Sequence, residues 1–398
     1  MTRTTRDSLI VQKFGGTSVG SIERIEAVAQ RVIKAKSEGN QLVVVVSAMS
    51  GETNRLMDLA LQVDAVPTAR ELDVLLSAGE QVTMALLAMT LNKMGTSAVS
   101  MTGYQAGIQT NDQHNNASIK HIDTQLIEAY LDLGQVVIVA GFQGITDDGN
   151  ISTLGRGGSD TTAVALAGAL KASECQIFTD VDGVYTCDPR VVPSATKLAT
   201  IDFPCMEEMA RKGAKVLHLP SVQHAWKQCV PLRVLSSFSH DSGTLVCGEK
   251  GEDQICGLAM QQDLILVQVL SAELHSLINQ CQLLGIDVWD VLKTENYQGV
   301  IIKQNQFAKL ALVLSEKICA SKNVSALTCV GNAAPERLHA IQSLLKKHNV
   351  DVFWSMKTKN SVMLLICPEQ LEVAANLVHN SFVVTNIELD GHQVLMVS

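Results

Sequence analysis

The feature that most constrains the fold is a run of five apolar residues at positions 42–46, four of which are valines. A strand that is apolar at every position is buried on both faces, which is typical of parallel strands in α/β proteins. Similar short runs alternate with helical apolar patterns from residue 8 to about 245. The sequence therefore predicts an α/β fold with an open, mainly parallel sheet between layers of helices.

The pattern changes after Gly248. The order strand, helix, two strands, helix then occurs twice, and a last strand is predicted near residues 393–397. Repeats of this kind and length are typical of ferredoxin-like units. We therefore predict a first domain over residues 1–248 and a second region over 249–398. The second region contains two βαββαβ units, at about 262–320 and 323–392.

Bulk properties exclude several classes of protein. The chain of 398 residues has a formal net charge of −9, which disfavours nucleic acid and anionic membranes as partners. Its ten cysteines form no C-x-x-C pair, so a zinc site is not indicated. The start of the chain is polar, unlike a secretory signal, and the longest apolar runs are too short to cross a bilayer. We expect a soluble, reduced, cytoplasmic protein.

The first predicted strand delivers Lys13 to a turn that contains Gly15 and Gly16. Glycines between a strand and a helix let backbone approach a ligand closely. Two hydroxyl residues follow, and then a predicted helix in which Ile22 is the first apolar residue. The start of this helix would add N–H groups and the positive end of its dipole, which favour a phosphate. The order of residues differs from that of a Walker loop, because the lysine precedes the glycines. A plain strand-to-helix turn with an exposed lysine is the alternative.

Other segments carry polar residues that point to a charged ligand. Arg156 lies among glycines ahead of a predicted helix that Ser159 or Asp160 could cap, and an arginine there suits a carboxylate or a phosphate. The loop at 179–190 combines carboxylates, a tyrosine and an arginine. In the long helix predicted at 71–94, Gly79 suggests that another segment approaches closely.

Two of these candidates have ordinary structural alternatives. Glu80 follows Gly79, and a helical glutamate more often lies on a solvated face. His218 is the one histidine that is placed for chemistry, and a structural role is the more common fate of such a residue.

The residue types fit transfer of a phosphoryl group. That reaction needs positioning and neutralisation of charge more than covalent chemistry from the protein. A carboxylate acceptor is already ionised at neutral pH, since a free aspartate side chain has a pKa of about 3.9, and so needs no general base. Asp180 or Asp182 could hold Mg²⁺ beside nucleotide phosphates.

Six motifs, in chain order, strongly resemble the aspartate kinase family. They are residues 13–19, 46–54, 77–80, 155–160, 179–190 and 212–218. The second region resembles the paired ACT domains of that family, so the resemblance covers nearly the whole chain. It implies an amino-acid-kinase fold followed by two ACT units.

The resemblance also implies roles for individual residues. Lys13 and Asp160 form the catalytic pair, in which the lysine stabilises the transferring phosphoryl group and the aspartate orients it. The residues that bind the substrate aspartate are Thr53, Glu80, Arg156 and Ser159, with Glu80 meeting the amino group. The residues that bind the nucleotide are Lys13, Gly15, Gly16, Ser47, Thr179, Asp180, Tyr185, Arg190 and Lys215.

The reaction implied is transfer from ATP, with Mg²⁺ carried by the nucleotide, to L-aspartate, giving 4-phospho-L-aspartate at the entry to lysine, threonine and methionine synthesis. The ACT region implies a homodimer or a higher homo-oligomer. Its first effector loop, residues 270–275, lacks the glycine usual in the family, and the second, residues 329–336, has a glycine and then a proline. Lys357 and Lys359 stand where the family has small polar residues and would repel a cationic effector. We therefore expect weak or absent inhibition by lysine.

Two alternatives remain open. The first is another amino-acid kinase with a carboxylate acceptor, such as a glutamate or N-acetylglutamate kinase. Against it stands the loop at 179–190 together with two ACT units. The second is a non-catalytic amino-acid sensor derived from a kinase. Against that stands the presence of every residue needed for turnover, while the effector loops are the part that departs from the family pattern.

Overall fold

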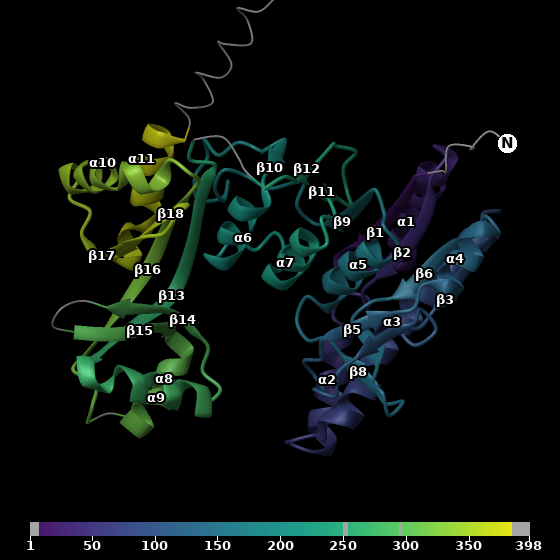
Figure 1. Cartoon of the computed structure of the whole chain (residues 1–398), viewed down its shortest axis with the longest axis horizontal. Coiled ribbons are helices and arrows are strands. Elements are labelled where there is room, and N and C mark those ends of the chain that lie inside the picture. Colours follow the sequence, from purple (N-terminus) through teal and green to yellow (C-terminus); the bar gives the residue numbers. More distant parts are fainter. Residues whose placement is uncertain (1–7, 250–253, 294–296, 315, 384–398) are drawn as a thin grey trace, which may run out of the picture. The chain divides into compact units, whose positions relative to one another are not determined.

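The structure is a computed structural model that describes residues 8–249, 254–293, 297–314 and 316–383. Contacts divide these residues into two units (Figure 1). The first contains the described residues up to 184, together with 197–203 and 216–249. The second contains residues 185–196 and 204–215 and the described residues from 254 onward.

The first unit is built on a parallel sheet, as predicted. Its strands are β1 (Leu9–Phe14), β2 (Gln41–Val46), β3 (Ala98–Met101), β6 (Val136–Ala140), β9 (Glu174–Thr179) and β11 (Leu232–Ser236), in the order β11-β9-β1-β2-β6-β3. Two short strands extend the β11 edge: β12 (Thr244–Val246), antiparallel to β11, and then β10 (Thr200–Ile201). The predicted open and mainly parallel sheet is confirmed.

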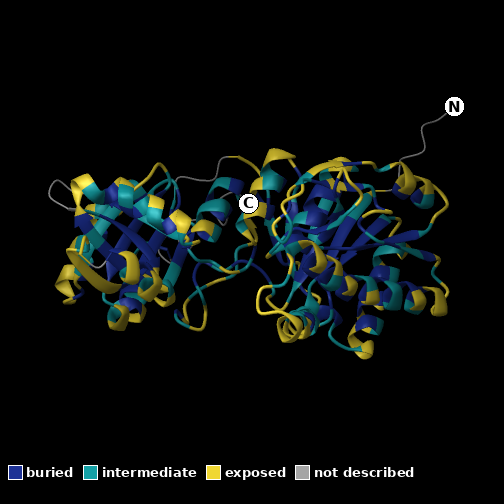
Figure 2. Ribbon diagram, turned by 90° about the horizontal axis from the view of Figure 1, so that it is seen from below, coloured by how far each residue is buried: buried dark blue, intermediate teal, exposed yellow. Residues whose placement is uncertain are grey.

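Helices cover both faces of this sheet. Helices α1 (Ile22–Ser37) and α3 (Ala69–Lys93) pack on one face, against alternate β2 residues such as Val44 and Val46. Helix α5 (Gly158–Ala169) packs on β1, β2 and β9 and also contacts α7 (Leu219–Lys227). Figure 2 shows buried strands and helices whose outer sides are exposed. Every residue from 42 to 46 has no exposed surface, as expected for a strand covered on both faces.

Helix α3 is a core helix of the first unit. By length and composition alone it could span a bilayer, and no other helix in the described residues meets that test. Half of its most apolar stretch is buried in the protein, and its buried residues include the carboxylates of Asp73 and Glu80. Helix α2 (Glu52–Val63) packs beside it.

A second, four-stranded sheet of this unit has the order β5-β4-β7-β8. Its strands are β4 (Ile108–Thr110), β5 (Ile119–Ile122), β7 (Gln143–Ile145) and β8 (Ile151–Thr153). Gly149, with a φ of +80°, lies in the turn that joins antiparallel β7 and β8. Strand β5 is followed by helix α4 (Gln125–Asp132).

The second unit contains a six-stranded antiparallel sheet in the order β14-β15-β13-β16-β18-β17. The strands are β13 (Gly257–Leu270), β14 (Val288–Lys293), β15 (Tyr297–Lys303), β16 (Ala320–Val330), β17 (Val352–Lys357) and β18 (Ser361–Ile366). The helices are α8 (Leu274–Leu283), α9 (Phe307–Leu314), α10 (Ala334–Lys347) and α11 (Leu371–Phe382). The predicted double repeat is confirmed in this order, and the last strand predicted at 393–397 lies outside the described residues.

The two repeats share their longest strands. Residues 264–270 of β13 pair with β15, whereas residues 325–330 of β16 pair with β18. Residues 257–268 of β13 also pair with β16, with a register shift between Gln261 and Leu264. This bulge changes which side chains face the helices: Leu258 packs against α10 and α11, and Ile265 packs against α8 and α9.

Two segments that precede residue 249 belong to this second unit. In residues 185–196, Thr186 Oγ1 lies 2.9 Å from Nε2 of the buried His379 in α11. In residues 204–215, which include most of α6 (Phe203–Arg211), Lys212 donates to Asp290 Oδ2 of β14 at 2.7 Å. These units are defined by contacts in space, so the division of the chain into 1–248 and 249–398 stays a prediction.

Candidate active site

A cavity of about 340 Å³ opens at the carboxyl ends of β1 and β2 in the first unit. In open α/β sheets this edge is where ligands bind. The cavity brings together eight of the residues predicted to form the site: Lys13, Gly16, Ser47, Thr53, Glu80, Arg156, Ser159 and Asp160. The motifs that are far apart in the sequence therefore meet around one space.

Lys13 and Asp160 form an ion pair in this cavity. Lys13 ends β1 and Asp160 lies in the first turn of α5, and their Nζ and Oδ1 atoms are 2.6 Å apart. Each residue is less than a tenth exposed. Asp160 Oδ1 has no partner of good hydrogen-bond geometry among the described residues. The contact is thus a close ion pair, and it holds the Lys13 ammonium near the carboxyl end of β1.

The turn after Lys13 is tighter than predicted. A 3₁₀ turn spans Gly16–Val19, and α1 begins only at Ile22, with Ser21 as its N-cap. The helix predicted from Ile22 is thus confirmed, and the 3₁₀ turn separates its N-terminus from Gly15. A Cβ on Gly16 would lie 2.9 Å from the carbonyl oxygen of Ala48, so only glycine lets this turn pack against the loop after β2.

Glu80 points into the core and not onto a solvated face. It is 4% exposed, and its Oε1 accepts the backbone N–H of Ala48 at 3.0 Å. Its Oε2 has no hydrogen-bond partner among the described residues. Burial raises the pKa of Glu80 to about 7, against the opposing effect of the Ala48 hydrogen bond. A buried oxygen without a partner beside a cavity is suited to a cationic ligand group.

The close approach expected at Gly79 explains how Glu80 reaches Ala48. A Cβ on Gly79 would lie 2.8 Å from the Ala48 Cβ. The glycine therefore lets α3 come close enough to the loop after β2 for the Glu80 hydrogen bond to form.

Arg156 provides positive charge in the same cavity. It is exposed, lines the cavity, and makes no ion pair or hydrogen bond with any described residue. Gly155 and Gly157 on either side have φ of +71° and +73°, a conformation that suits glycine. Gly157 is the N-cap of α5, and no side chain caps this helix. The prediction that Ser159 or Asp160 caps it was therefore wrong.

Other lining residues come from separate segments of the first unit. Ser47 follows β2, and Thr53 lies in the first turn of α2. Phe142 and His218 also line it, and the His218 ring packs against Gly157, where a Cβ would lie 2.4 Å from the ring. Phe142 was not predicted, because an apolar residue after a buried strand gives no signal of a site.

Thr179 is the last residue of β9 and Asp180 follows it, and neither residue lines this cavity. The Thr179 hydroxyl donates to Asp180 Oδ1 at 3.1 Å. Asp182 lies 3.5 Å from the Lys197 ammonium, which also pairs with Asp241. In the part of the chain that the structure describes, no three His, Cys, Asp or Glu side chains come together as a metal site. An exposed carboxylate such as Asp180 fits Mg²⁺ that is held chiefly by nucleotide phosphates.

The other predicted nucleotide residues lie in the second unit. Arg190 makes two hydrogen bonds to the Asp188 carboxylate, at 3.0 and 2.7 Å. These bonds, with a smaller contribution from the charge of Lys215, lower the pKa of Asp188. Tyr185 lies on the same segment, and Lys215 is exposed. The nucleotide-binding role of Tyr185, Arg190 and Lys215 stays a prediction.

Comparison with known proteins agrees with this geometry. The amino acid kinase family matches residues 8–236. An aspartate kinase of Pseudomonas putida is 60% identical over 260 residues, which are 64% of this chain and 63% of that protein. The chain thus spans less than two thirds of the length of this relative.

Solved structures extend the likeness beyond the matched region. The aspartate kinase of Synechocystis is 34% identical, with a TM-score of 0.57, over 94% of this chain and 69% of that one. E. coli aspartokinase III shares the fold, with a TM-score of 0.78 at 24% identity, over 94% of this chain and 99% of that one. The chain therefore belongs to the amino acid kinase family, and its likeness within that family is to aspartate kinases.

Proposed function

We propose that this protein is an aspartate kinase, which transfers the γ-phosphoryl group of ATP to the β-carboxylate of L-aspartate. The observation that carries the proposal is one cavity with three charged features: the Lys13–Asp160 pair, the buried Glu80 and the unpaired Arg156. The E. coli aspartokinase III structure of similar fold contains aspartate and ADP. The product, 4-phospho-L-aspartate, would enter lysine, threonine and methionine synthesis.

Recognition of the acceptor follows from complementary charge. An α-amino acid carries an ammonium and a carboxylate on one carbon, and aspartate has a second carboxylate in its side chain. Glu80 would accept the ammonium, through the Oε2 atom that lacks a protein partner. Arg156 would pair with a carboxylate in two parallel hydrogen bonds, and Thr53 and Ser159 would bind through their hydroxyls.

The chemical step needs no proton transfer. An ionised β-carboxylate oxygen attacks the γ-phosphorus, the bond from that phosphorus to the β–γ bridging oxygen breaks, and ADP leaves with the electron pair of that bond. Lys13 would stabilise the charge on the transferring group. Asp160, 2.6 Å from the Lys13 ammonium, holds that lysine in place.

Nucleotide and metal would bind beside this cavity. Gly15 and Gly16 lie in the turn after Lys13, Ser47 lies after the neighbouring strand β2, and all three would contact phosphates. Thr179, Asp180, Tyr185, Arg190 and Lys215 are the further nucleotide-binding residues of the proposal. Mg²⁺ arrives with ATP and neutralises phosphate charge, and Asp180 is the better carboxylate for it, because Asp182 already faces Lys197.

The ACT units would assemble a homodimer or a higher homo-oligomer, and we propose weak inhibition by lysine. In the first loop, Glu273 pairs with Lys317 at 2.8 Å, so this carboxylate already has a cation. In the second loop, a Cβ on Gly331 would lie 2.2 Å from the Gln254 carbonyl oxygen. Its glycine therefore serves packing within the chain and is not held open for an effector. A cytoplasmic location is part of the same proposal.

The test is an assay of ADP release with Mg-ATP and L-aspartate, run beside L-glutamate and N-acetyl-L-glutamate. Hydroxylamine added to the reaction traps an acyl phosphate as a hydroxamate, which identifies the carboxylate as the acceptor. Turnover with aspartate that is indifferent to added lysine and threonine is the expected result. Turnover with another acceptor alone, or amino-acid binding without turnover, would replace the proposal by one of the two alternatives.

A further inference from the structure

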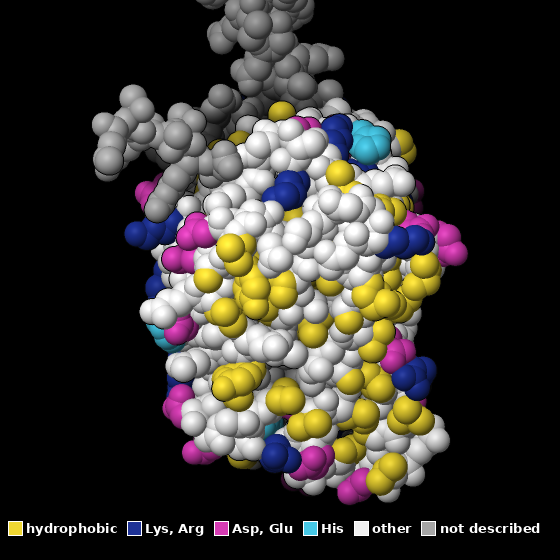
Figure 3. All heavy atoms as spheres, turned by 90° about the vertical axis from the view of Figure 1, so that its right-hand side faces the viewer, with side chains coloured by type: hydrophobic (Ala, Val, Ile, Leu, Met, Phe, Trp, Pro, Cys, Tyr) yellow, Lys and Arg dark blue, Asp and Glu magenta, His cyan; other side chains and the backbone are white. Residues whose placement is uncertain are grey.

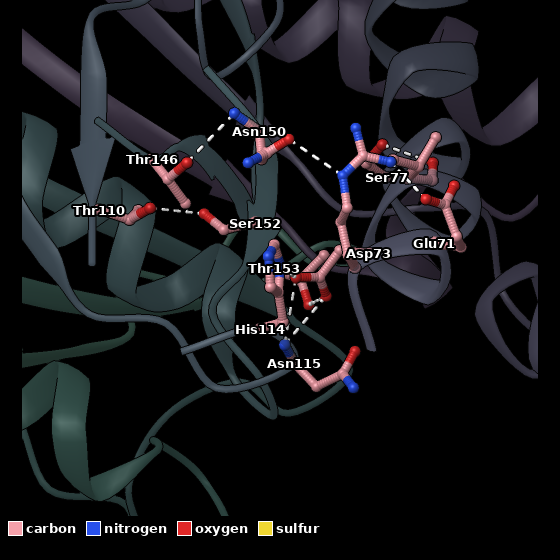
Figure 4. Close-up of polar contacts among 12 residues, drawn as sticks. Glu71, Asp73, Ser77, Thr110, His114, Asn115, Thr146, Asn150, Ser152 and Thr153 are labelled. Carbon is pink, nitrogen blue, oxygen red and sulfur yellow. Dashed lines mark hydrogen bonds and ion pairs between the residues drawn. The ribbon is translucent and has the colours of Figure 1, made fainter. Parts of the chain in front are cut away.

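Outside the cavity, α3 carries a second buried carboxylate, that of Asp73, which has no exposed surface. Figure 4 shows that its two oxygens meet side chains and backbone from two other segments. The Thr153 hydroxyl of β8 donates to Oδ1 at 2.5 Å, and the Asn115 N–H donates to Oδ1 and Oδ2 at 3.0 and 3.2 Å. His114 Nδ1 lies 2.6 Å from Oδ2. A buried carboxylate with this many donors is a fixed point of the structure.

Through these bonds Asp73 holds the loop at 111–118. The loop is also attached to β8, because the Ala117 N–H donates to the Thr153 carbonyl oxygen at 2.8 Å. Asn115 has a φ of +64°, which is uncommon for a residue with a side chain. A carboxylate that accepts the N–H of this residue compensates for the cost of that conformation.

The held loop packs directly against the turn that carries Arg156. A Cβ on Gly155 would lie 3.0 Å from Asn116 Oδ1 and 3.1 Å from the Asn115 carbonyl oxygen. Thr153, the other partner of Asp73, is only two residues before Gly155. Asp73 therefore restrains the Arg156 turn from two sides, through β8 and through the loop.

The same helix restrains Glu80. Asp73 and Glu80 are seven residues apart on α3, which puts them on one face of the helix about 10 Å apart. A further bond ties this face to the small sheet, because Gln143 Nε2 of β7 donates to the Ser77 carbonyl oxygen at 2.9 Å. One helix thus carries Glu80 and, seven residues earlier, the Asp73 carboxylate that anchors the Arg156 turn.

We propose that Asp73 and His114 are positioning residues that set the separation between Glu80 and Arg156, and thereby the length of amino acid that the site accepts. This inference rests on the proposed function, in which Glu80 binds the ammonium and Arg156 a carboxylate of the acceptor. Neither Asp73 nor His114 lines the cavity. Their effect would reach the acceptor only through the placement of these two charges.

The test uses the full chain and two pairs of variants. Asp73→Asn keeps the shape of the side chain but turns one acceptor oxygen into a donor that faces other donors, and Asp58→Asn on neighbouring α2 is its exposed control. His114→Leu removes the donor to Asp73, whereas His114→Asn keeps a nitrogen donor near the position of Nδ1. The measurements are KM and kcat for L-aspartate, L-glutamate and Mg-ATP, together with Tm.

We expect Asp73→Asn and His114→Leu to raise the KM for aspartate at least tenfold, with the KM for Mg-ATP within twofold of the wild-type value. The preference for aspartate over glutamate, as the ratio of kcat/KM values, should fall at least threefold. His114→Asn should restore both. Equal changes in the two KM values that follow Tm, or no change in active and folded variants, would overturn the inference alone. A wild-type chain that is inactive with aspartate would instead overturn the proposed function and, with it, this inference.

Discussion

At the scale of single residues, Lys13 is the cation nearest the proposed transfer. Replacing it with alanine should lower kcat for aspartate phosphorylation by about 10²–10³-fold, because charge on the transferring phosphoryl group loses its stabilisation. The Lys13–Asp160 pair lines a cavity, so water can hydrate Asp160 in the variant. We therefore expect a smaller loss of unfolding free energy than the roughly 3–5 kcal/mol of a fully enclosed broken pair. ADP release and chemical denaturation measure the two effects.

Lys93→Ala is the matched control, because the side chain of Lys93 is 80% exposed. The change removes only a 3.9 Å contact between its ammonium and the Glu26 carboxylate. Its kcat should equal that of the wild-type chain. A near-normal kcat in Lys13→Ala would remove this lysine from the proposed catalytic pair.

The raised pKa of Glu80 predicts how aspartate binding depends on pH. Only the ionised carboxylate attracts the substrate ammonium, and with a pKa of about 7 the ionised fraction falls about tenfold from pH 8 to pH 6. The KM for aspartate should rise by a similar factor over that range. Glu80→Gln should have a high KM that does not change with pH, and Glu71→Gln, an exposed residue of the same helix, should behave as the wild type.

Glu80 should also affect stability, with a defined sign. Its pKa of about 7 in the folded protein is above the ordinary value of 4.5, so the unfolded chain releases this proton first as the pH rises. Stability from the protonated carboxyl is thus present below pH 4.5 and is lost progressively up to pH 7, on the order of 3 kcal/mol in all. Glu80→Gln should gain stability relative to wild type from pH 5 to pH 8. A gap between their unfolding free energies that stays constant with pH would contradict this.

At the scale of elements, the position of α3 depends on Gly79. Alanine is the better helix former by about 1 kcal/mol, yet its Cβ would lie 2.8 Å from that of Ala48. Because the strain exceeds this gain, we expect Gly79→Ala to lower the unfolding free energy by about 1–3 kcal/mol. The displaced helix should also raise the KM for aspartate, through the Glu80–Ala48 hydrogen bond.

Gly168→Ala in α5 is the control for this prediction, since the new Cβ would meet only the flexible side chain of Gln228. Thermal unfolding and the KM for aspartate of the two variants decide the matter. Equal behaviour of the two variants would mean that the approach of α3 to Ala48 has no energetic role.

The elements that the sequence predicted well are those with a long apolar period. The strand at 42–46 and the helix α3 could be predicted without tertiary information, because apolar residues recur at every position of the strand and at every turn of the helix. The strands β4 and β5 are three and four residues long, and residues such as Gln109 and His121 break the apolar pattern in them. Their pairing with β7 and with each other, and not local preference, makes them strands.

At the scale of the whole molecule, Lys212 joins the segment at 204–215 to the sheet of the second unit. Its ammonium is 2.7 Å from Asp290 Oδ2 and 5.0 Å from the centre of the Trp289 ring, and its side chain is 6% exposed. Lys212→Met keeps the length and leaves Asp290 unpaired, which should cost about 3 kcal/mol of unfolding free energy. Lys212→Met with Asp290→Asn should recover most of that loss. A double variant no better than the single one would show that the charge pairing is unimportant.

The sequence predicted the site only in part, because some segments pack against parts of the chain that are far away in the sequence. Motifs identified Lys13, Glu80, Arg156 and Asp160, and the structure brings them to one cavity. The sequence did not reveal that the segments at 185–196 and 204–215 would pack with the C-terminal sheet, because their partners, such as His379 and Asp290, lie 78 to 193 residues away. Contacts between residues so far apart in the sequence produce no local periodic pattern from which they could be predicted.

The strands shared by the two repeats have a consequence for how such a chain can be recombined. β13 supplies residues 257–261 beside one repeat and 264–270 to the other, and β16 serves both in the same way. A cut that removed one repeat would take a central strand from its neighbour and expose a hydrogen-bonding edge in the middle of the sheet. The two repeats therefore form one structural unit, and a hybrid chain that takes this unit from a relative must take both repeats together, or neither.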